Sequence, residues 1–309
     1  MGKTVTAYAP ASVGNVGVGF DALGHALDFA GDRVRLTVIE GKDILLDAVT
    51  GLTLDLPSDA GSNTALRALR AIQDEYNIRV GARVTLEKGI PLGSGMGGSA
   101  ASAVAAVTAA AEAWGLSLSE DDKLRFALEG EAAASGGLHA DNVAPSLFGG
   151  LVLCEGVRRP HVTRIPVPRN IACVLVHPDL EVYTRSARNM LSAGVSLADH
   201  VCQTQAIAGF VAGCFRSDLD QIRRCLKDVV IEPQRAELVP GFRKVQSAAM
   251  ANGALGASLS GSGPSIFAWC ESSQAEEIRG CMTHAFQADG VSCSSWISAV
   301  NAAGARLED

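Results

Sequence analysis

Residues 91–102 constrain this chain more than any other segment. They run Pro-Leu-Gly-Ser-Gly-Met-Gly-Gly-Ser-Ala-Ala-Ser and lie between a predicted strand and a long apolar helix. Glycine lets backbone N–H groups approach a ligand closely, and a helix N-terminus favours an anion. The segment therefore predicts a phosphate-binding loop. It is not a P-loop, because the pattern Gly-x-x-x-x-Gly-Lys-Ser/Thr is absent from the sequence.

Length and charge limit what else the chain can be. Its 309 residues suffice for two domains with their own cores. A formal net charge of −7 argues against nucleic acid as a main partner. The eight cysteines form no Cys-x-x-Cys pair, which favours reduced, buried thiols over disulfides or zinc. The most apolar run, residues 100–111, is too short to cross a bilayer, so we expect a cytoplasmic protein without membrane contact.

Hydrophobic periodicity gives an outline of the N-terminal half. Strands are predicted at residues 4–9, ending at Pro10, and at 33–40, 80–87 and 150–154. Helices are predicted at residues 63–76 and 99–114, and a third begins after an N-capping Ser119 and runs toward residue 134. A loop is expected over residues 135–145.

The Pro- and Arg-rich segment 158–170 is the predicted domain boundary, so the domains are placed at residues 1–165 and 166–309. Beyond it, strands are predicted at 171–176, 255–260, 265–270 and 291–299, with helices within 196–216, 240–252 and 274–287. Reduced to its main elements, this order is β-α-β-β-α-β, the split βαβ or ferredoxin-like pattern.

Two more glycine-rich segments, residues 10–21 and 256–265, accompany the first. Gly93-x-Gly95-x-x-Gly98 also matches a dinucleotide-binding fingerprint, which requires strand, turn, helix and strand, with an acidic residue about 20 positions on. Two successive helices follow this match, so the context argues against a dinucleotide oxidoreductase.

Taken together, these segments resemble the GHMP superfamily of small-molecule kinases, and within it the homoserine kinases. Residues 91–101 are close to the superfamily pattern Pro-x-x-x-Gly-Leu-Gly-Ser-Ser-Ala. The more specific matches are Pro-Ala-x-x-x-Asn-x-Gly-x-Gly-Phe-Asp at 10–21, His-Ala-Asp-Asn-Val-Ala-Pro at 139–145 and Ser-Gly-Ser-Gly-Pro-Ser at 260–265. Gly98, Met96 and Val18 depart from the usual serine, leucine and proline. The resemblance spans nearly the whole chain.

The resemblance implies an α+β, two-domain GHMP kinase fold. An N-terminal domain like domain 2 of ribosomal protein S5 would bind ATP, and a ferredoxin-like split βαβ domain would follow. The implied reaction is Mg²⁺-dependent transfer of the γ-phosphoryl group of ATP to the side-chain hydroxyl of L-homoserine, on the route to threonine, by a homodimer. A kinase for another hydroxylated metabolite and a non-catalytic ATP- and metabolite-binding regulator are the alternatives.

Implied phosphate ligands come from one loop and the helix that follows. The residues assigned to ATP are Pro91, Gly93, Ser94, Gly95, Met96, Gly97, Gly98, Ser99 and Ala100, with Asn63 near the adenine. A helix N-cap explains Asn63 equally well. Magnesium prefers carboxylate and hydroxyl oxygens together with phosphate, and the resemblance assigns it to Ser99 and Glu131.

The acceptor pocket implied by the resemblance is rich in charge. Arg188 and Arg235 suit the carboxylate, because a guanidinium can donate two parallel hydrogen bonds to it. The remaining assigned residues are Asn15, Asp21, His139, Asp141, Asn142, Thr184 and Gly261. Asp21 would pair with the ammonium or lie near the hydroxyl, and Thr184 would contact substrate or cap a helix. Arg185 is expected to be an ordinary surface arginine.

Catalytic roles fall to Asp21, Glu131, Asp141 and Asn142, and two mechanisms stay open. In one, Asp141 or Asp21 is a general base on the hydroxyl. In the other, Asn142 orients the hydroxyl and its proton leaves late to a phosphate oxygen. A loose transition state demands little activation of the nucleophile, which favours the second.

Overall fold

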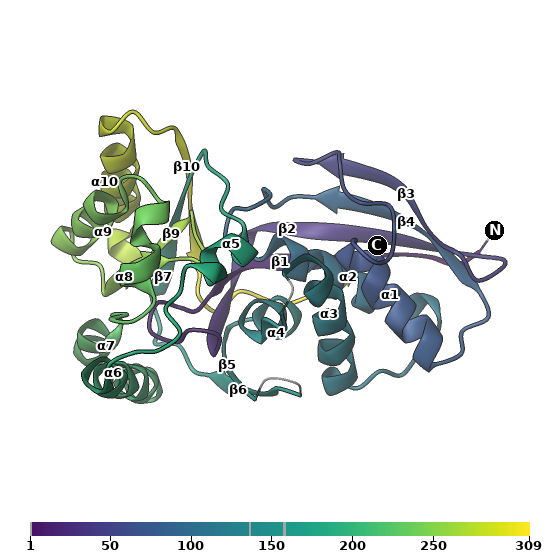
Figure 1. Ribbon diagram of the computed structural model, residues 1–309, viewed down its shortest axis with the longest axis horizontal. Coiled ribbons are helices and arrows are strands. Elements are labelled where there is room, and N and C mark those ends of the chain that lie inside the picture. Colours follow the sequence, from purple (N-terminus) through teal and green to yellow (C-terminus); the bar gives the residue numbers. More distant parts are fainter. Residues whose placement is uncertain (1, 136, 157–158) are drawn as a thin grey trace.

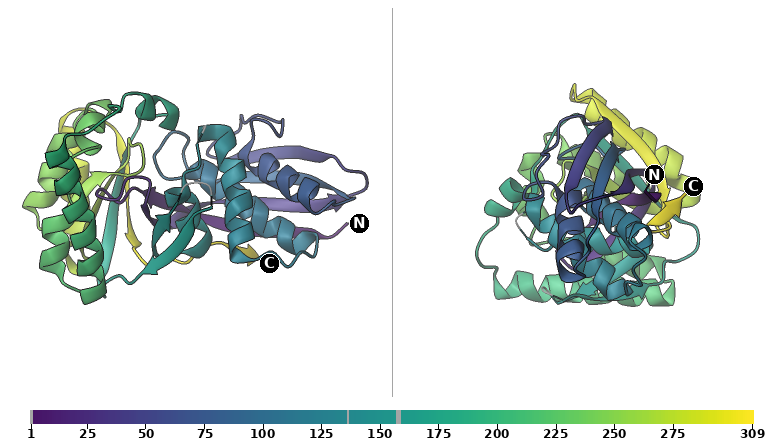
Figure 2. Two further views of the ribbon diagram at one scale, coloured as in Figure 1. Left: turned by 60° about the horizontal axis from the view of Figure 1, so that its bottom comes forward. Right: turned by 90° about the vertical axis from the view of Figure 1, so that its right-hand side faces the viewer.

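The computed structural model describes residues 2–135, 137–156 and 159–309. The molecule is elongated, and a sheet with its helices forms each end (Figure 1). Strands β1 (Thr4–Gly14) and β2 (Leu23–Ile39) run along the long axis and pair antiparallel. Both termini lie in the same half of the molecule, as the further views show (Figure 2).

The N-terminal sheet has the strand order β11-β1-β2-β4-β3, and β5 joins it by pairing with both β2 and β6. Its other strands are β3 (Ile44–Gly51), β4 (Gly81–Lys88), β5 (Leu151–Glu155), β6 (His161–Ile165) and β11 (Arg306–Glu308). Only β3 and β4 pair in parallel among the pairings described.

Four helices accompany this sheet: α1 (Thr64–Glu75), α2 (Gly98–Ala113), α3 (Glu120–Ser135) and α4 (Ala140–Phe148). Helix α2 is rich in alanine and buried on nearly every side, since it packs against β1 and β2 as well as α1, α3 and α4. Small side chains let the backbones approach closely, so a helix that is apolar all round fits the centre of this domain.

The C-terminal sheet has the order β10-β7-β9-β8, and its neighbouring strands pair antiparallel. Its strands are β7 (Ile171–Pro178), β8 (Gly256–Leu259), β9 (Ile266–Glu271) and β10 (Cys293–Ala299). The first and last strands of this sheet in the chain, β7 and β10, are neighbours. The third strand, β9, lies between the first and the second, β7 and β8, as the split βαβ pattern requires. The ferredoxin-like prediction is therefore confirmed.

Both faces of this second sheet are buried. Val174 and Val176 pack in one core with α9 (Phe242–Ala251) and α10 (Ala275–Ala288), and Cys173 and Leu175 belong to a second core. That second core includes residues of α6 (Leu197–Arg216) and α7 (Leu219–Cys225) and continues into the N-terminal sheet. The alternation follows from the two-residue period of a strand.

Two short helices remain in the described chain, of which α5 (Thr184–Asn189) lies near the centre of the molecule and α8 (Glu232–Arg235) lies beside α9 at the end that holds the C-terminal sheet (Figure 1). Helix α5 follows β7, and α8 leads into the 3₁₀ turn η1 (Ala236–Leu238). A second 3₁₀ turn, η2 (Ser272–Gln274), precedes α10. In the described ranges no helix combines the length and apolarity needed to span a membrane.

A buried joint links the two sheets. Trp269 of β9 donates from Nε1 to Nε2 of His25 in β2 at 3.2 Å, and Nδ1 of His25 lies 2.9 Å from the Ala26 carbonyl. Complete burial lowers the pKa of His25 to about 4, so the ring is neutral and can both donate and accept. Phe29 and Trp296 stack nearby with ring centroids 4.8 Å apart.

Several local features differ from the predictions. Strand β2 begins at Leu23 rather than at residue 33. The first strand continues past Pro10 to Gly14, because a shift in register between Pro10 and Ser12 accommodates the proline. Strand β3 was missed. The expected loop 135–145, of which residue 136 lies outside the described ranges, contains the start of α4, and Pro145 lies inside that helix.

The predicted boundary segment is more structured than expected. Residue 158 lies outside the described ranges, but β6 pairs with β5 inside this segment, and β11 returns from the C-terminus to pair with β1. The division at residues 165 and 166 stays a prediction.

Candidate active site

A cavity of about 460 Å³ lies between the loop at residues 91–98 and segments that follow strands of both sheets. It contains most of the predicted site. The predicted residues on its wall are Asn15, Asp21, Pro91, Gly93, Ser94, Gly95, Gly97, Gly98, Ser99, Glu131, His139, Asp141, Asn142, Thr184, Arg188, Arg235 and Gly261. Residues up to 246 positions apart in sequence are hydrogen-bonded here.

The phosphate end of the cavity is built from backbone. Gly93, Gly95 and Gly97 adopt positive φ angles of 59°, 77° and 67°, which glycine accepts without strain. A Cβ atom on Gly95 would lie 2.4 Å from the Ser260 carbonyl oxygen, so this position has no room for a side chain. Gly97, the N-cap of α2, supplies no side chain to the first-turn N–H groups, which leaves them for an anion.

The carbonyl groups of this loop are already engaged. Backbone N–H groups of Ser12, Ser265 and Val182 donate to the carbonyls of residues 96, 94 and 93 at 3.0, 3.2 and 2.9 Å. The Ser260 hydroxyl donates to the Gly95 carbonyl at 2.7 Å. Donors that lie in or beside strands of both sheets therefore hold the carbonyl side of the loop.

Three residues predicted for ATP do not line the cavity. Met96 and Ala100 are completely buried in the core. Asn63 caps α1, because its Oδ1 accepts from the N–H groups of Ala65 and Leu66. The capping alternative thus accounts for Asn63, and its contact with adenine stays a prediction.

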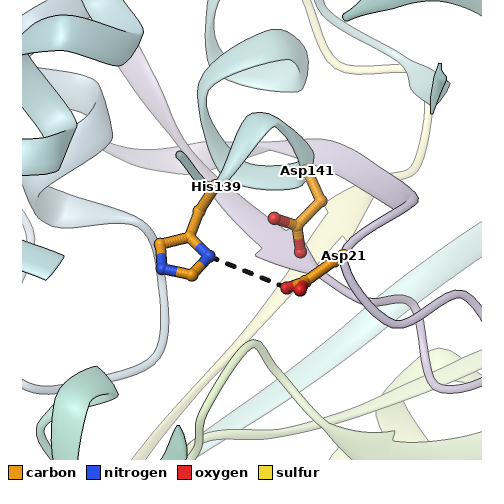
Figure 3. A group of neighbouring side chains, drawn as sticks. All are labelled: Asp21, His139 and Asp141. Atoms are coloured by element: carbon orange, nitrogen blue, oxygen red, sulfur yellow. Dashed lines mark ion pairs between the residues drawn. The ribbon is translucent and has the colours of Figure 1, made fainter. Parts of the chain in front are cut away.

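Acidic and basic side chains gather at the other end of the cavity. Asp21, His139 and Asp141 bring their polar atoms within 4.8 Å of one another (Figure 3). Nη2 of Arg188 donates to both carboxylate oxygens of Asp21, at 2.6 and 2.8 Å, and lies 3.2 Å from Nδ1 of His139. His139 precedes α4 and Asp141 lies in its first turn, where the helix dipole favours negative charge.

Burial and neighbouring charges shift the pKa values of this group. Burial and the charge of Asp21 raise the pKa of Asp141 to about 6. Burial acts to raise the pKa of Asp21, but its interactions with His139 and Arg188 outweigh burial and lower that pKa. Burial acts to lower the pKa of His139, but its interaction with Asp21 and the charge of Asp141 raise it. Such divergent values suit a site that binds and moves charge.

Asn15 connects three segments of the pocket. Its N–H donates to Asp141 at 2.9 Å, its Nδ2 to the Gly261 carbonyl at 2.7 Å, and its Oδ1 accepts from the Asp21 N–H at 3.1 Å. Asn15, Val16 and Asp21 have φ angles of 66°, 42° and 57°, a region that non-glycine residues seldom adopt. This strain is concentrated in the segment that positions the acceptor pocket.

Phe20 organises the two arginines. The guanidinium carbons of Arg188 and Arg235 each lie 5.2 Å from the centroid of its ring. Arg235 is 3% exposed and donates to the carbonyls of Ala187 and Gly261 at 3.3 and 3.4 Å. Burial and the charge of Arg188 lower the pKa of Arg235. The sequence analysis missed Phe20, although its place directly before Asp21 was a usable signal.

The remaining wall residues were also missed or assigned differently. Those without a predicted role are Leu92, Val182, Tyr183, Arg185, Ser186 and Ser262. Arg185 was expected to be an ordinary surface residue, and it is exposed, yet it lines the cavity. The segment 182–186 reaches the site through the hydrogen bond from Val182 N–H to the loop, a long-range contact with no signal in the sequence.

Ser99 and Glu131 fit a magnesium ion by their chemistry. Ser99 lies in the first turn of α2, and Glu131 of α3 is 5% exposed, yet both line the cavity. A hydroxyl and a carboxylate are hard oxygen ligands of the kind that Mg²⁺ accepts beside phosphate. The Asp21, His139 and Asp141 group is less suitable, because the Arg188 cation already contacts Asp21.

Comparisons with known proteins agree with this geometry. The family models for the N-terminal and C-terminal domains of GHMP kinases match residues 63–150 and 210–288. A homoserine kinase of Xylella fastidiosa strain M12 is 44% identical, over 97% of this chain and 93% of its own length. One from Xanthomonas campestris is 42% identical over 99% and 94%.

A solved structure matches equally well. The crystal structure of homoserine kinase from Cytophaga hutchinsonii superposes with a TM-score of 0.95 at 41% identity and covers 100% of this chain and 98% of its own. Similarity of this extent in sequence and structure shows that the chain belongs to the homoserine kinase family of the GHMP kinases.

Proposed function

We propose that the protein transfers the γ-phosphoryl group of ATP to the side-chain hydroxyl of L-homoserine and so produces O-phospho-L-homoserine. One observation carries this proposal: a single cavity joins a backbone-built anion site to a pocket that holds two arginines and a buried aspartate. Phosphoryl transfer needs mainly positioning and charge stabilisation, and this cavity offers both.

At the phosphate end, the loop and the first turn of α2 would hold the phosphates of ATP. Ser99 and Glu131 would hold Mg²⁺, which when bound offsets the negative charge of the phosphates. The carbonyl groups of the loop accept hydrogen bonds from residues in or beside both sheets, and these bonds support the loop from the side of its carbonyl groups.

At the acceptor end, the charges of homoserine match those of the pocket. Its carboxylate would bind Arg188 and Arg235, and its ammonium would bind Asp21 and Asp141. Arg188 pairs with Asp21 in the structure. A zwitterion can replace this pair with one new partner for each charge, whereas a ligand with a single charge leaves one side without a partner.

Asn142 is the residue that we assign to the acceptor hydroxyl. It follows Asp141 in the first turn of α4, lines the cavity and accepts a hydrogen bond from the Ser12 hydroxyl at 3.2 Å. An ammonium beside Asp141 would lower the pKa of that carboxyl and make it a weak base. The hydroxyl proton would then leave to a phosphate oxygen, as a loose transition state permits.

The test is ADP release by the purified protein with Mg-ATP and a panel of acceptors: L-homoserine, L-serine, L-threonine, mevalonate and galactose. The expected result is turnover with L-homoserine that is lost in Arg235→Leu and kept in Arg224→Leu, which changes an exposed arginine outside the cavity wall. Turnover with another acceptor would support the other superfamily kinases, and nucleotide binding without turnover would support a non-catalytic regulator. Assembly as a homodimer and a cytoplasmic location stay predictions.

A further inference from the structure

A buried charge cluster lies behind the phosphate loop and outside the cavity. Asp32 of β2, Lys88 of β4 and Ser102 of α2 are each no more than 3% exposed. Nζ of Lys88 donates to the Asp32 carboxylate, to the Ser102 hydroxyl at 2.8 Å and to the Gly98 carbonyl at 3.0 Å. The Ser102 hydroxyl donates to Asp32 at 2.6 Å. We call Asp32, Lys88 and Ser102 the Lys88 cluster.

The position of this cluster in the chain is informative. Residues 89 and 90 lead from Lys88, the last residue of β4, into the phosphate loop, which ends at Gly98, where α2 starts. Lys88 bonds the carbonyl of Gly98, and the N–H of Gly89 donates to the other oxygen of Asp32 at 3.1 Å. The two ends of segment 89–98, which contains the phosphate loop, are therefore both bonded to one ion pair.

Stability alone explains this arrangement poorly. Burying two charges carries a desolvation penalty that often equals or exceeds their attraction, so apolar residues of similar volume commonly serve as well. A cation next to the N-terminal turn of a helix is also opposed by the helix dipole. The cluster instead provides fixed geometry. Lys88 of β4 donates to three partners, two of them in α2, and so fixes the spacing of β4 and α2.

We propose that the Lys88 cluster positions the phosphate loop for nucleotide binding. It fixes the distance between the two ends of segment 89–98 from the side that faces away from the cavity. Lys88 is not on the cavity wall, so it acts through Gly98 rather than by touching phosphate. Ile90 and Lys88 pack closely against Gly98, since a Cβ atom on Gly98 would lie 3.2 Å from the Ile90 side chain and 3.7 Å from Nζ of Lys88. The inference rests on the proposed function only in that the loop binds nucleotide.

The test uses Asp32→Asn/Lys88→Met, which removes both charges, keeps an acceptor for the Gly89 N–H and cuts the bond to Gly98. Thermal melting reports the fold, and calorimetric titration with Mg-ADP, without acceptor, reports the loop. We expect a melting temperature near that of the wild type. ADP binding should be about tenfold weaker and the KM for ATP about tenfold higher, while the KM for homoserine should be unchanged. Lys3→Met, which breaks an exposed pair with Glu112, is the control.

A folded double variant that binds ADP as the wild type does would overturn the proposal, as would a change confined to the KM for homoserine. If the double variant does not fold, Ser102→Ala decides, because it keeps the ion pair and loses only the hydroxyl bridge. ADP binding about threefold weaker in Ser102→Ala supports positioning. Unchanged ADP binding in that variant contradicts it. Since these titrations contain no acceptor, they do not depend on whether homoserine is the substrate.

Discussion

The two ends of the cavity recognise charge in opposite ways. The phosphate end presents the glycine backbone of a loop whose carbonyl groups already accept hydrogen bonds. The acceptor end presents the side chains of Asp21, Asp141, Arg188 and Arg235. One end is therefore damaged by adding atoms and the other by removing charge. Only the acceptor end should respond to pH near neutrality.

Gly95→Ala tests the backbone end and should have the largest effect. Its Cβ would lie 2.4 Å from the Ser260 carbonyl, so the loop must shift, and a misplacement of about 1 Å can reduce activity about 100-fold. Mg-ADP titration is the measurement. Gly115→Ala is the matched control, since Gly115 also has a positive φ, 65°, but has open space around its Cβ position. Equal losses in both variants would show that strain, not the close contact, is responsible.

Arg188→Met tests the side-chain end. The substitution removes a charged partner of the homoserine carboxylate and leaves Asp21 without its ion pair. It should therefore lower kcat/KM for homoserine about 30-fold, while ADP binding stays unchanged. Arg224→Met, which changes an exposed arginine of α7 outside the cavity wall, should change kcat/KM little. A comparable fall in both variants, or weaker ADP binding in Arg188→Met, would break the proposed division between the two ends.

The pH dependence should separate binding from chemistry. The pKa of Asp141 is about 6 in the free protein, so kcat/KM for homoserine should fall about tenfold between about pH 7 and pH 5 as the carboxyl takes up a proton. With homoserine bound, its ammonium lowers that pKa, and kcat should stay flat over the same range. In Asp141→Asn the acidic fall should disappear. An equal fall in kcat would instead identify Asp141 as a general base.

Acid unfolding must be separated from that effect, and His25 is the group to examine. Its pKa is lowered to about 4, so between pH 6.5 and 4 the unfolded chain takes up a proton that the folded chain does not. Stability is thus lost as the pH falls, by about 3 kcal/mol over the full range. Relative to His25→Gln, whose amide can still donate and accept, the wild type should lose this amount in urea unfolding. A constant difference between the two proteins would contradict the assignment.

Much of the fold followed from local pattern, because periodicity, caps and turn residues are local signals. Asn63 and Ser119 mark the starts of α1 and α3, and the order of elements after residue 170 gave the ferredoxin-like sheet. Strand β3 was missed because its exposed residues blur the alternation. Helix α4 was missed because its Asp, Asn and Pro residues favour turns locally, whereas packing against β1 and β2 holds them in a helix.

The site residues, like the fold, could be predicted only where the signal was local in sequence. The glycine-rich segments and the family pattern identified most of the cavity wall, including Arg188 and Arg235. Contacts that depend on tertiary packing were not accessible. Phe20 could have been noticed beside Asp21, but its contact with both arginines could not, and neither could the bond from Val182 to the phosphate loop, since each contact connects segments far apart in the chain.

The most direct test of the account is ADP formation with L-homoserine and two analogues at saturating Mg-ATP. 4-Hydroxybutyrate lacks the ammonium and 3-aminopropan-1-ol lacks the carboxylate. We predict efficient turnover of L-homoserine and a kcat/KM at least about 100-fold lower for either analogue, because each leaves charged groups of the pocket without a partner. Similar kcat/KM values for all three compounds would contradict the claim that the acceptor end recognises a zwitterion.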